Sequence, residues 1–427
     1  MDQKLQAGAV EVDITPPVGT GFDGYSAREG TSRGVLDSLL AQLLLLKCGE
    51  SQVVLISMDL LGVSLDFTQR VREGITQAIG VPGLCTMVSC THTHSGAGGF
   101  LPQAPGIYTA QDPELQSIVA RKLVGAAIWA HERLQPARLG VSKGQVEGIG
   151  RNRNDPEKGI VDQEVIILRV DDASGQPIAV LMNYGCHPTV LGYQNLFFSA
   201  DYPGAARAAL RSIYPHTIFL FTNGASGDIS TRFTRRDQSY REVERMGRIL
   251  AGEVLKTMQL IMTQDAVPLG ARVAEVEPKF RRFPSPDEAQ RELERLQAEL
   301  ETLKAAGATH GEIRRATTRV EGAMGQALMA KEVSNIKPRS SQVQVLQIGD
   351  LALVGWPGEA FTRTVLEIKQ QSKYPYTAVV SYANDYLGYF PDAVSIAEGT
   401  YEALISPYGA DAAEELRDVA LRLLQEG

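Results

Sequence analysis

The sequence is poor in cysteine. Its four cysteines, Cys48, Cys85, Cys90 and Cys186, are spread over a chain of 427 residues. They are too few and too dispersed for a disulfide framework, and such usage is typical of proteins kept in a reducing compartment. A small fold held together by disulfide bonds is therefore excluded.

Segments for secretion or membrane insertion are also missing. The first residues, MDQKLQAGAV, lack the apolar core of a signal peptide. The longest apolar run, LLAQLLLLKCG at 39–49, is too short to span a bilayer and predicts a buried strand instead. We therefore expect a soluble, cytoplasmic protein.

No block of one charge sign stands out. The chain has 42 basic and 50 acidic residues, a net charge of −8, and both signs are interspersed. Without a basic stripe we expect no nucleic-acid partner, and we find no clear membrane-docking segment. There is no internal repeat or low-complexity tract. The hydrophobic content of 44% is enough for a sizeable core.

Short apolar runs that end in polar or glycine-rich loops recur along the chain. They lie at 53–59, 84–90, 178–185, 217–224 and 351–358. Runs of this length and with these boundaries predict buried strands. Helical stretches at 113–134, 202–213 and 238–260 lie between them. This alternation predicts an α/β fold, in which ligand groups gather in the loops after strands.

Two further segments refine the architecture. Residues 167–180 are typical of a β-hairpin, so we expect a mixed sheet core with flanking helices. Residues 285–336 predict a charged helical hairpin, with Ser285 as N-cap, Glu288 completing a capping box and Gly307 near the turn. This hairpin is interpreted as an insertion on the surface, with a dimerisation or lid element as the alternative.

Two of the six histidines, His92 and His94, lie in SCTHTHSGAGG at 89–99, directly after a predicted strand. In an extended chain both rings point to the same side. Such a pair alone is a weak signal. It gains weight because His187 follows a second predicted strand and Glu359 follows another. Imidazoles and a carboxylate together are typical zinc ligands.

Structural alternatives exist for several of these residues. His187 is also compatible with a core histidine bonded to backbone, and Glu359 with a helix cap. Asp228 is as compatible with holding a loop as with binding metal. Cys90 and Cys186, which flank the histidine segments, fit small buried residues better than thiolate ligands.

Several separated segments, taken in order, resemble the N-terminal catalytic domain of the neutral/alkaline non-lysosomal ceramidases. They are AGAVEVDITPPVG, THTHSGAGG, NRN at 152–154, NYGCHPTVLG with SADYPG, NGASGDIS, WPGEAFT, and NDYLGY with GTYEA. The THTHSGAGG segment combined with the later GDIS and PGE is specific, whereas the tyrosine match is weaker. Together these segments extend over nearly the whole chain.

This resemblance implies a set of site residues. The zinc ligands would be His92, His187, Glu359 and Tyr389, holding one Zn²⁺ per chain. The residues that orient substrate or handle protons would be His94, Arg153 and Tyr401, with Ser230 beside the metal. Zinc would lower the pKa of a bound water and polarise the carbonyl that is cleaved. Of the four ligands, Tyr389 is the least usual.

The sequence also departs from the family pattern. Ala97 replaces a proline of the histidine motif, and the arginines Arg232, Arg235 and Arg236 add positive charge near the expected site. Such charge is unusual beside an uncharged lipid amide. The family's C-terminal immunoglobulin-like domain and a secretion signal are not found, so we expect 1–427 to form one catalytic domain.

The sequence therefore predicts a zinc-dependent amidohydrolase that cleaves a ceramide-type or smaller amide. An esterase or lactonase with the same zinc site and a non-catalytic metal-binding protein are alternatives. A metal-free serine hydrolase using Ser230 is a third, although SGDIS is not a nucleophile elbow. The expected partner is a small-molecule or lipid amide, and the helical hairpin is a candidate contact for a homo-oligomer.

Overall fold

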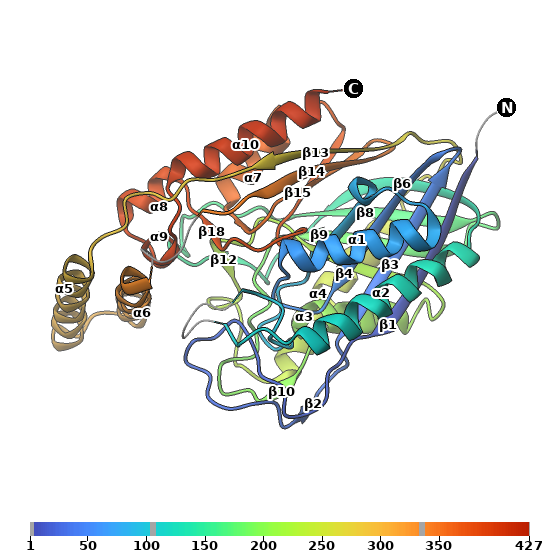
Figure 1. Cartoon of the computed structure of the whole chain (residues 1–427). Coiled ribbons are helices and arrows are strands. Elements are labelled where there is room, and N and C mark those ends of the chain that lie inside the picture. The colour runs from blue at the N-terminus through green and yellow to red at the C-terminus, as the bar shows by residue number, and fades with distance from the viewer. Residues whose placement is uncertain (1–3, 103–107, 333–337, 427) are drawn as a thin grey trace.

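The computed structural model describes residues 4–102, 108–332 and 338–426, and an eight-stranded sheet forms its centre (Figure 1). Its strands are β1 (Leu5–Asp13), β3 (Leu40–Cys48), β4 (Ser51–Met58), β5 (Thr86–Cys90), β6 (Gln135–Gln145), β8 (Glu164–Asp172), β9 (Pro177–Tyr184) and β11 (Ile218–Asn223). Their spatial order is β11-β9-β8-β6-β1-β3-β4-β5. The outer pairs β11–β9 and β4–β5 are parallel, and the pairs between them are antiparallel.

A second, four-stranded sheet packs on one face of the first. It has the order β13-β14-β15-β17 and consists of β13 (Leu269–Val276), β14 (Ser341–Ile348), β15 (Leu351–Gly355) and β17 (Tyr376–Val380). Leu168 of β8 and its cross-strand partner Leu181 of β9 share a buried cluster with Leu346 and Leu353 of this sheet. The adjacent Ile167 faces the opposite side, where it packs among helical residues.

Helices cover the outer faces of both sheets. On the large sheet these are α1 (Leu65–Ile79), α2 (Pro113–Glu132), α3 (Asp201–Arg211) and α4 (Tyr240–Met258). On the small sheet they are α7 (Thr362–Gln371) and α10 (Ala410–Gln425). The order is therefore helix, sheet, sheet, helix, which explains why the strands are buried on both faces and read as continuous apolar runs.

The expected α/β fold with a mixed sheet and flanking helices is confirmed. The five apolar runs correspond to β4, β5, β9, β11 and β15, and the predicted hairpin is the antiparallel pair β8–β9 with a bulge after Val170. The sequence did not reveal that the strands belong to two sheets. No helix in the described part of the chain is both long and apolar enough to cross a bilayer.

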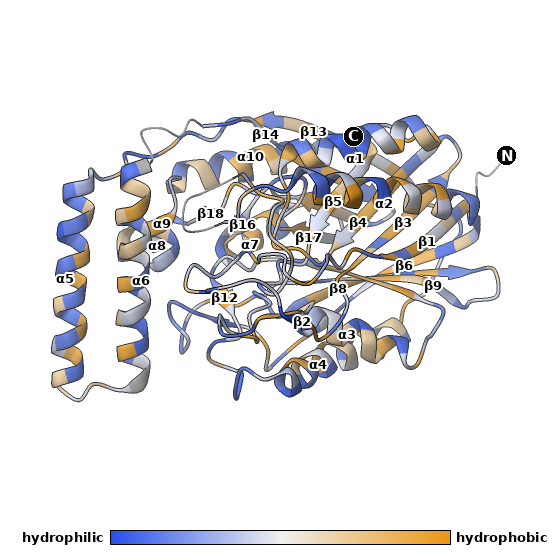
Figure 2. Cartoon of the chain, turned by 60° about the horizontal axis from the view of Figure 1, so that its bottom comes forward, coloured by the Kyte–Doolittle hydropathy of each residue, from blue (hydrophilic) through white to orange (hydrophobic). Residues whose placement is uncertain are grey.

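The predicted helical hairpin consists of α5 (Pro286–Ala305) and α6 (His310–Glu332). Ser285 and Glu288 form the expected capping box, and Gly307 has a φ of 68° in the turn. The last residues of the predicted range, 333–336, lie outside the described residues. In Figure 2 the hairpin stands beside the body of the molecule, with α6 nearer to it. There α6 packs on the short helix α9 (Tyr401–Ile405).

Small elements complete the region around the strand ends. They are β2 (Gly34–Val35) with β10 (Phe197–Phe198), β7 (Arg151–Asn152) with β12 (Ile229–Ser230), β16 (Glu359–Ala360) with β18 (Tyr389–Phe390), the 3₁₀ turn Gly83–Cys85 and α8 (Ala393–Glu398). The pair β16–β18 places Glu359 directly opposite Tyr389.

Candidate metal centre

Loops that follow strands of both sheets meet at one place. Asn223, the last residue of β11, donates from its side-chain amide to the carbonyl oxygens of Thr91 (3.1 Å) and Cys186 (3.2 Å). Its own carbonyl accepts from the backbone of Ser381, 2.9 Å away, after β17. One asparagine thus joins the residues that precede His92 and His187.

The twist of the large sheet explains how loops from its two edges come together. β11 and β5 are the outermost strands of this sheet. Adjacent strands rotate by roughly 20–25°, so eight strands accumulate about half a turn. The edges then approach each other, and Ser57 of β4 donates a hydrogen bond of 2.5 Å to the carbonyl of Phe221 in β11.

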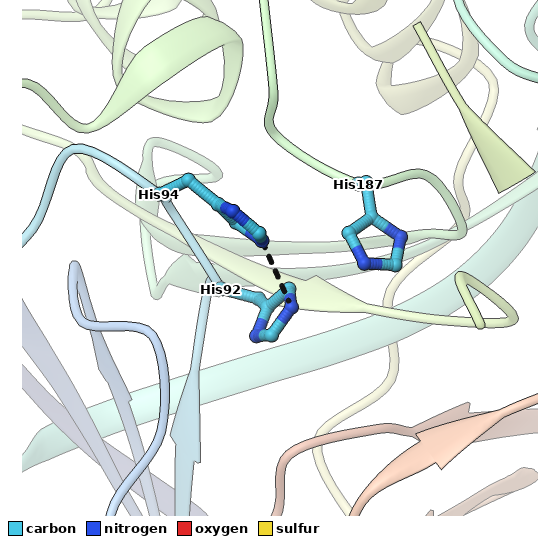
Figure 3. Close-up of side chains that lie close together, drawn as sticks. All are labelled: His92, His94 and His187. Atoms are coloured by element: carbon cyan, nitrogen blue, oxygen red, sulfur yellow. Dashed lines mark hydrogen bonds between the residues drawn. The ribbon is translucent and has the colours of Figure 1, made fainter. Parts of the chain in front are cut away.

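Three buried histidines, His92, His94 and His187, form the centre of this region (Figure 3). One ring nitrogen from each lies within 4.8 Å of the others, a spacing at which the three could hold a metal ion. The Nε2 atoms of His92 and His94 are 3.3 Å apart. His92 and His94 come from the loop after β5, and His187 comes from the loop after β9.

The backbone at His92 is not extended, contrary to our expectation. Its φ of 68° lies in the left-handed region, as do those of Tyr382 (60°) and Asn384 (66°). Non-glycine residues in this region are strained, and such strain concentrates at functional sites. The rings of His92 and His94 meet because of this turn, not because of strand alternation.

Backbone carbonyls fix which nitrogen of His92 and His187 carries the hydrogen. Nδ1 of His92 lies 2.8 Å from the carbonyl oxygen of Leu61, and Nδ1 of His187 lies 2.5 Å from that of Ser226. Because a carbonyl only accepts, both Nδ1 atoms carry the hydrogen and both Nε2 atoms have a free lone pair. Nε2 of His187 is buried and has no hydrogen-bond partner. This arrangement fits a metal ion.

Glu359, the first residue of β16, lies beside two of these histidines. Its Oε2 is 3.0 Å from Nε2 of His187 and 3.8 Å from Nε2 of His92. Tyr386 donates to Oε1 at 2.6 Å and Tyr382 to Oε2 at 3.3 Å. Burial raises the pKa of the Glu359 carboxyl. The carboxylate is thus held by two phenols and directed at the histidines.

The histidines are neutral over the physiological pH range. Burial lowers the pKa of His92 and of His187 to about 3, and that of His94 well below its usual range. A neutral imidazole is the form that binds metal. The close approach of His187 to Glu359 is therefore not an ion pair, since only one partner is charged.

Arg153 lies beside Tyr389 and Tyr401. Its Nη2 donates to the hydroxyl of Tyr389 (3.0 Å) and to the carbonyl of Gly227 (2.6 Å). Its Nε lies 2.5 Å from Glu402. Burial opposes the charge on Arg153, but the Glu402 carboxylate raises the pKa of this guanidinium well above its usual range.

The two predicted tyrosines lie next to each other, and Tyr389 lies beside His187. The ring centre of Tyr389 is 6.4 Å from that of His187, and the ring centre of Tyr401 is 6.3 Å from that of Tyr389. Burial raises the pKa of Tyr389 well above its usual range and that of Tyr401 to about 12. Both phenols are therefore protonated, and Tyr389 would need a bound cation to act as a phenolate ligand.

Asp228 and Ser230 follow β11, and Ser230 is the last residue of β12. Asp228 accepts from the backbone and hydroxyl of Thr362 (2.9 and 2.8 Å) and from Asn152 (3.0 Å), so it joins loops and is not part of the histidine group. Ser230 pairs through its backbone with His187, and its Oγ accepts from the backbone of Arg232 at 3.3 Å.

Cys90 and Cys186 are buried, and burial raises the pKa of both thiols above their usual range. Neither is a ready thiolate ligand, which agrees with the interpretation as small buried residues.

Sequence reasoning missed several residues that support the centre. Four of them lie inside the segments that resemble the ceramidase family: Asn223, Ser226, Tyr386 and Glu402. Their closeness in sequence to predicted site residues is the signal that could have identified them. Tyr382 lies outside these segments. Its ring stacks on that of His92 with centres 3.8 Å apart, and its hydroxyl lies 2.7 Å from that of Ser226.

Comparison with known proteins agrees with the motifs. A family model described as neutral/alkaline non-lysosomal ceramidase, N-terminal, matches residues 5–230. Neutral ceramidase A of Dictyostelium discoideum is 28% identical over 258 residues, which cover 54% of this chain and 36% of that protein. Neutral ceramidase 2 of Arabidopsis thaliana is 26% identical over 243 residues, covering 53% of this chain and 31% of that protein. The aligned stretches thus span about a third of these relatives.

The fold is shared over more of the chain. The crystal structure of neutral ceramidase from Pseudomonas aeruginosa superposes with a TM-score of 0.78 and 19% sequence identity. The match covers 99% of this chain and 74% of that one. At such low identity the likeness shows a common fold.

Proposed function

The chain belongs to the neutral/alkaline non-lysosomal ceramidase family, and from this premise we propose that it is a zinc-dependent hydrolase of a ceramide-type amide. One observation carries the proposal. The Nε2 atoms of His187 and His92 lie 3.0 and 3.8 Å from Oε2 of Glu359, both Nδ1 atoms are held by backbone carbonyls, and Nε2 of the buried His187 has no hydrogen-bond partner.

His92, His187 and Glu359 would hold the metal, with Tyr389 as the fourth ligand. His94 is the alternative fourth ligand, because its ring nitrogen belongs to the same group. A bound Zn²⁺ supplies a water of lowered pKa and polarises the carbonyl of the amide.

Arg153 is placed to stabilise the oxyanion. Its Nε and Nη2 are engaged by Glu402, Tyr389 and Gly227, which leaves Nη1 without a partner among the described residues. A guanidinium fixed in this way donates to a developing negative charge without reorganising. Tyr401, whose ring lies 5.9 Å from the guanidinium carbon, keeps its proton and is the second donor.

His94 is the group that handles the proton of the departing amine. Its Nε2 faces the histidine group, whereas its buried Nδ1 has no hydrogen-bond partner. A neutral imidazole with one free nitrogen both accepts and returns a proton, which is the property required of a general acid and base.

A metal-free serine mechanism has less support. No histidine in the described part of the chain forms a hydrogen bond with Oγ of Ser230, and Nδ1 of His187 is engaged by backbone carbonyls. Hydrolysis of an ester or lactone by the same centre is the main alternative, since the chemistry that a bound zinc would supply suits either carbonyl. The cytoplasmic location and the contribution of the hairpin to a homo-oligomer stay predictions.

To test this proposal, the wild type and His92→Ala are purified without metal-affinity chromatography, and the bound metal is quantified in both. We expect about one zinc per wild-type chain and none in the variant. Short-chain ceramide, an ester and a lactone are then assayed with and without a chelator. Absence of zinc from the wild type, with no activity restored by added zinc, contradicts the proposal.

A further inference from the structure

Three arginines near the candidate metal centre have no acidic partner. Arg28, Arg232 and Arg235, which we call the arginine rim, make no ion pair within the described part of the chain. Arg153 and Arg207, by contrast, are buried and each pairs with a carboxylate. A sheltered guanidinium without a counter-ion costs free energy, so the rim needs an explanation.

Each rim arginine is fixed close to a residue of the centre. Nη1 of Arg28 donates to the carbonyl of His94 at 2.5 Å. Nη1 of Arg235 donates to the carbonyl of Thr189, two residues after His187. Nη1 of Arg232 donates to the hydroxyl of Thr318 in α6 at 2.9 Å, and Arg232 follows Ser230 by two residues.

Tyr25 locates the rim relative to His94. The rings of Tyr25 and His94 meet edge to face with their centres 4.7 Å apart. All three rim arginines act electrostatically on the hydroxyl of Tyr25. Arg232 also lies in the field of Arg314 and Glu321 of α6 and of Arg153 and Glu402. Arg232 is therefore positioned between the side of the centre that carries His94 and the side that carries Arg153.

The rim arginines differ in the donors they keep free. Arg28 directs all three nitrogens at backbone carbonyls, so it has fewer free donors than the other two. Arg232 and Arg235 each engage Nη1 and keep Nε and Nη2 without a partner among the described residues. Burial lowers the pKa of Arg28 and Arg232 to about 10, which is the effect of withdrawing a cation from water without an ion-paired carboxylate.

We propose that Arg232 and Arg235 form an anion-binding subsite beside the candidate metal centre, and that the substrate is an N-acyl amide whose amine half carries a carboxylate. The subsite lies on the same side of the centre as His94, which we assign to protonating the departing amine. The anionic group of the substrate is therefore expected on its amine half. The inference rests on the proposed amide hydrolysis and narrows its substrate class.

The reaction needs no further reactant. Water adds its oxygen to the acyl carbon, the C–N bond breaks, and the nitrogen takes up a proton. The products are a fatty acid and an amino acid whose own carboxylate is unchanged.

The test compares two substrates that differ only in charge, N-dodecanoylglycine and N-dodecanoylglycinamide, with zinc-loaded enzyme. A hydrogen-bonded charge pair predicts a preference of about 10- to 100-fold in kcat/KM for the anionic compound. Arg232→Gln and, separately, Arg235→Gln should reduce this preference chiefly through KM. Arg236→Gln, an exposed arginine of the same loop, is the matched control and should retain it.

Equal kcat/KM for the two compounds in the wild type overturns the inference and leaves the proposed amidase function intact if short-chain ceramide is cleaved. If Arg232→Gln and Arg235→Gln lose kcat/KM equally on both compounds, the two arginines have a purely structural role. That result also overturns the inference. If no amide is cleaved, the proposed function fails. Binding of the two compounds, measured by calorimetry, then tests the anion-binding subsite separately. Tighter binding of the anionic compound that is lost in Arg232→Gln supports the subsite, and equal binding rejects it.

Discussion

His187 and Glu359 direct two hydrogen-bond acceptors at each other across 3.0 Å, with Nδ1 of His187 already donating to backbone. Two lone pairs at this distance repel unless a proton or a cation lies between them. Burial raises the pKa of Glu359, and this favours uptake of a proton at this position when no cation is bound. A metal ion would compete with that proton, so metal affinity should fall as the pH is lowered.

Glu359→Gln tests this arrangement. The amide keeps the shape of the side chain and donates to Nε2 of His187, but it removes a charged ligand. We expect the metal-free variant to unfold at the same temperature as the wild type or higher. Loss of a residue that hydrogen-bonds to a metal ligand typically lowers metal affinity by roughly 10- to 100-fold. Loss of the ligand Glu359 itself should lower zinc affinity by at least this much. Competition with a chelating dye measures the affinity, and unchanged zinc binding would exclude Glu359 as a ligand.

His92 and His94 should separate metal binding from turnover. We expect His92→Ala to lose zinc and activity together. His94→Ala should retain zinc and lose about 10²- to 10⁴-fold in kcat, the usual contribution of a positioned general acid or base. Metal content and kcat are measured on the same samples. If His94→Ala also loses its zinc, His94 is the fourth ligand and Tyr389 is not.

The buried pair of Arg153 and Glu402 gives a stability prediction. Glu402 is fully buried, and Glu402→Gln leaves the guanidinium without its counter-ion. Removal of one partner from such a pair costs about 3–5 kcal/mol. Urea unfolding should show this loss, and the double variant Arg153→Met, Glu402→Gln should recover part of it. A change below 1 kcal/mol in the single variant would contradict the assignment.

At the scale of elements, α6 of the hairpin supports α9, the helix that carries Tyr401 and Glu402. Gly322 permits this contact, because a Cβ atom there would lie 3.0 Å from the Cα of Tyr401. Gln326 adds a hydrogen bond of 3.1 Å to the carbonyl of Leu404. The hairpin is thus joined to the candidate site through α9.

Gly322→Ala should push α9 away and lower kcat, and it should also reduce stability. Gly311→Ala in the same helix is the control, since nothing lies within 4 Å of its Cβ position. There alanine should be neutral or add up to about 1 kcal/mol through helix propensity. Steady-state kinetics and thermal unfolding of the two variants check this. Equal kinetics in both would show that α6 does not position α9.

The sequence predicts elements best where the signal is local. The capping box of Ser285 and Glu288 is predictable because its two side chains are three residues apart. The buried strands are predictable because each is a short apolar run bounded by polar or glycine-rich residues. The division into two sheets was not found, because Leu168 and Leu346 look alike in sequence and differ only in the sheet to which they belong. The contact of Gly322 with Tyr401 joins distant segments and left no local trace.

The candidate site shows the same limit. Ligand types after strand ends pointed to His92, His187 and Glu359, and the structure brings these three together. Whether they bind metal stays a prediction. The left-handed turn at His92 and the clamp by Asn223 could not be foreseen, since both depend on how the twisted sheet closes.

At the scale of the whole molecule, metal binding should stabilise the fold, because the ligands come from loops after β5 and β9 of the large sheet and β15 of the small sheet. The unfolded chain does not bring them together. At a free zinc concentration of 100 times Kd, the unfolding free energy should rise by about 2.7 kcal/mol. Thermal unfolding across a zinc titration measures this. His92→Ala should show no such rise, and a rise of equal size there would place the metal elsewhere.

The second sheet also sets the timing of biosynthesis. The large sheet is complete once residue 223 has been made, but the strands that cover its inner apolar face end at Val380. Translation proceeds at about 5–20 residues per second, so this face waits for roughly 10–30 s before its cover emerges from the ribosome. Glu359 also belongs to this late segment, and Tyr389 follows its end by nine residues. Until residue 389 has been made, the nascent chain therefore exposes an apolar face and lacks two of its four proposed ligands.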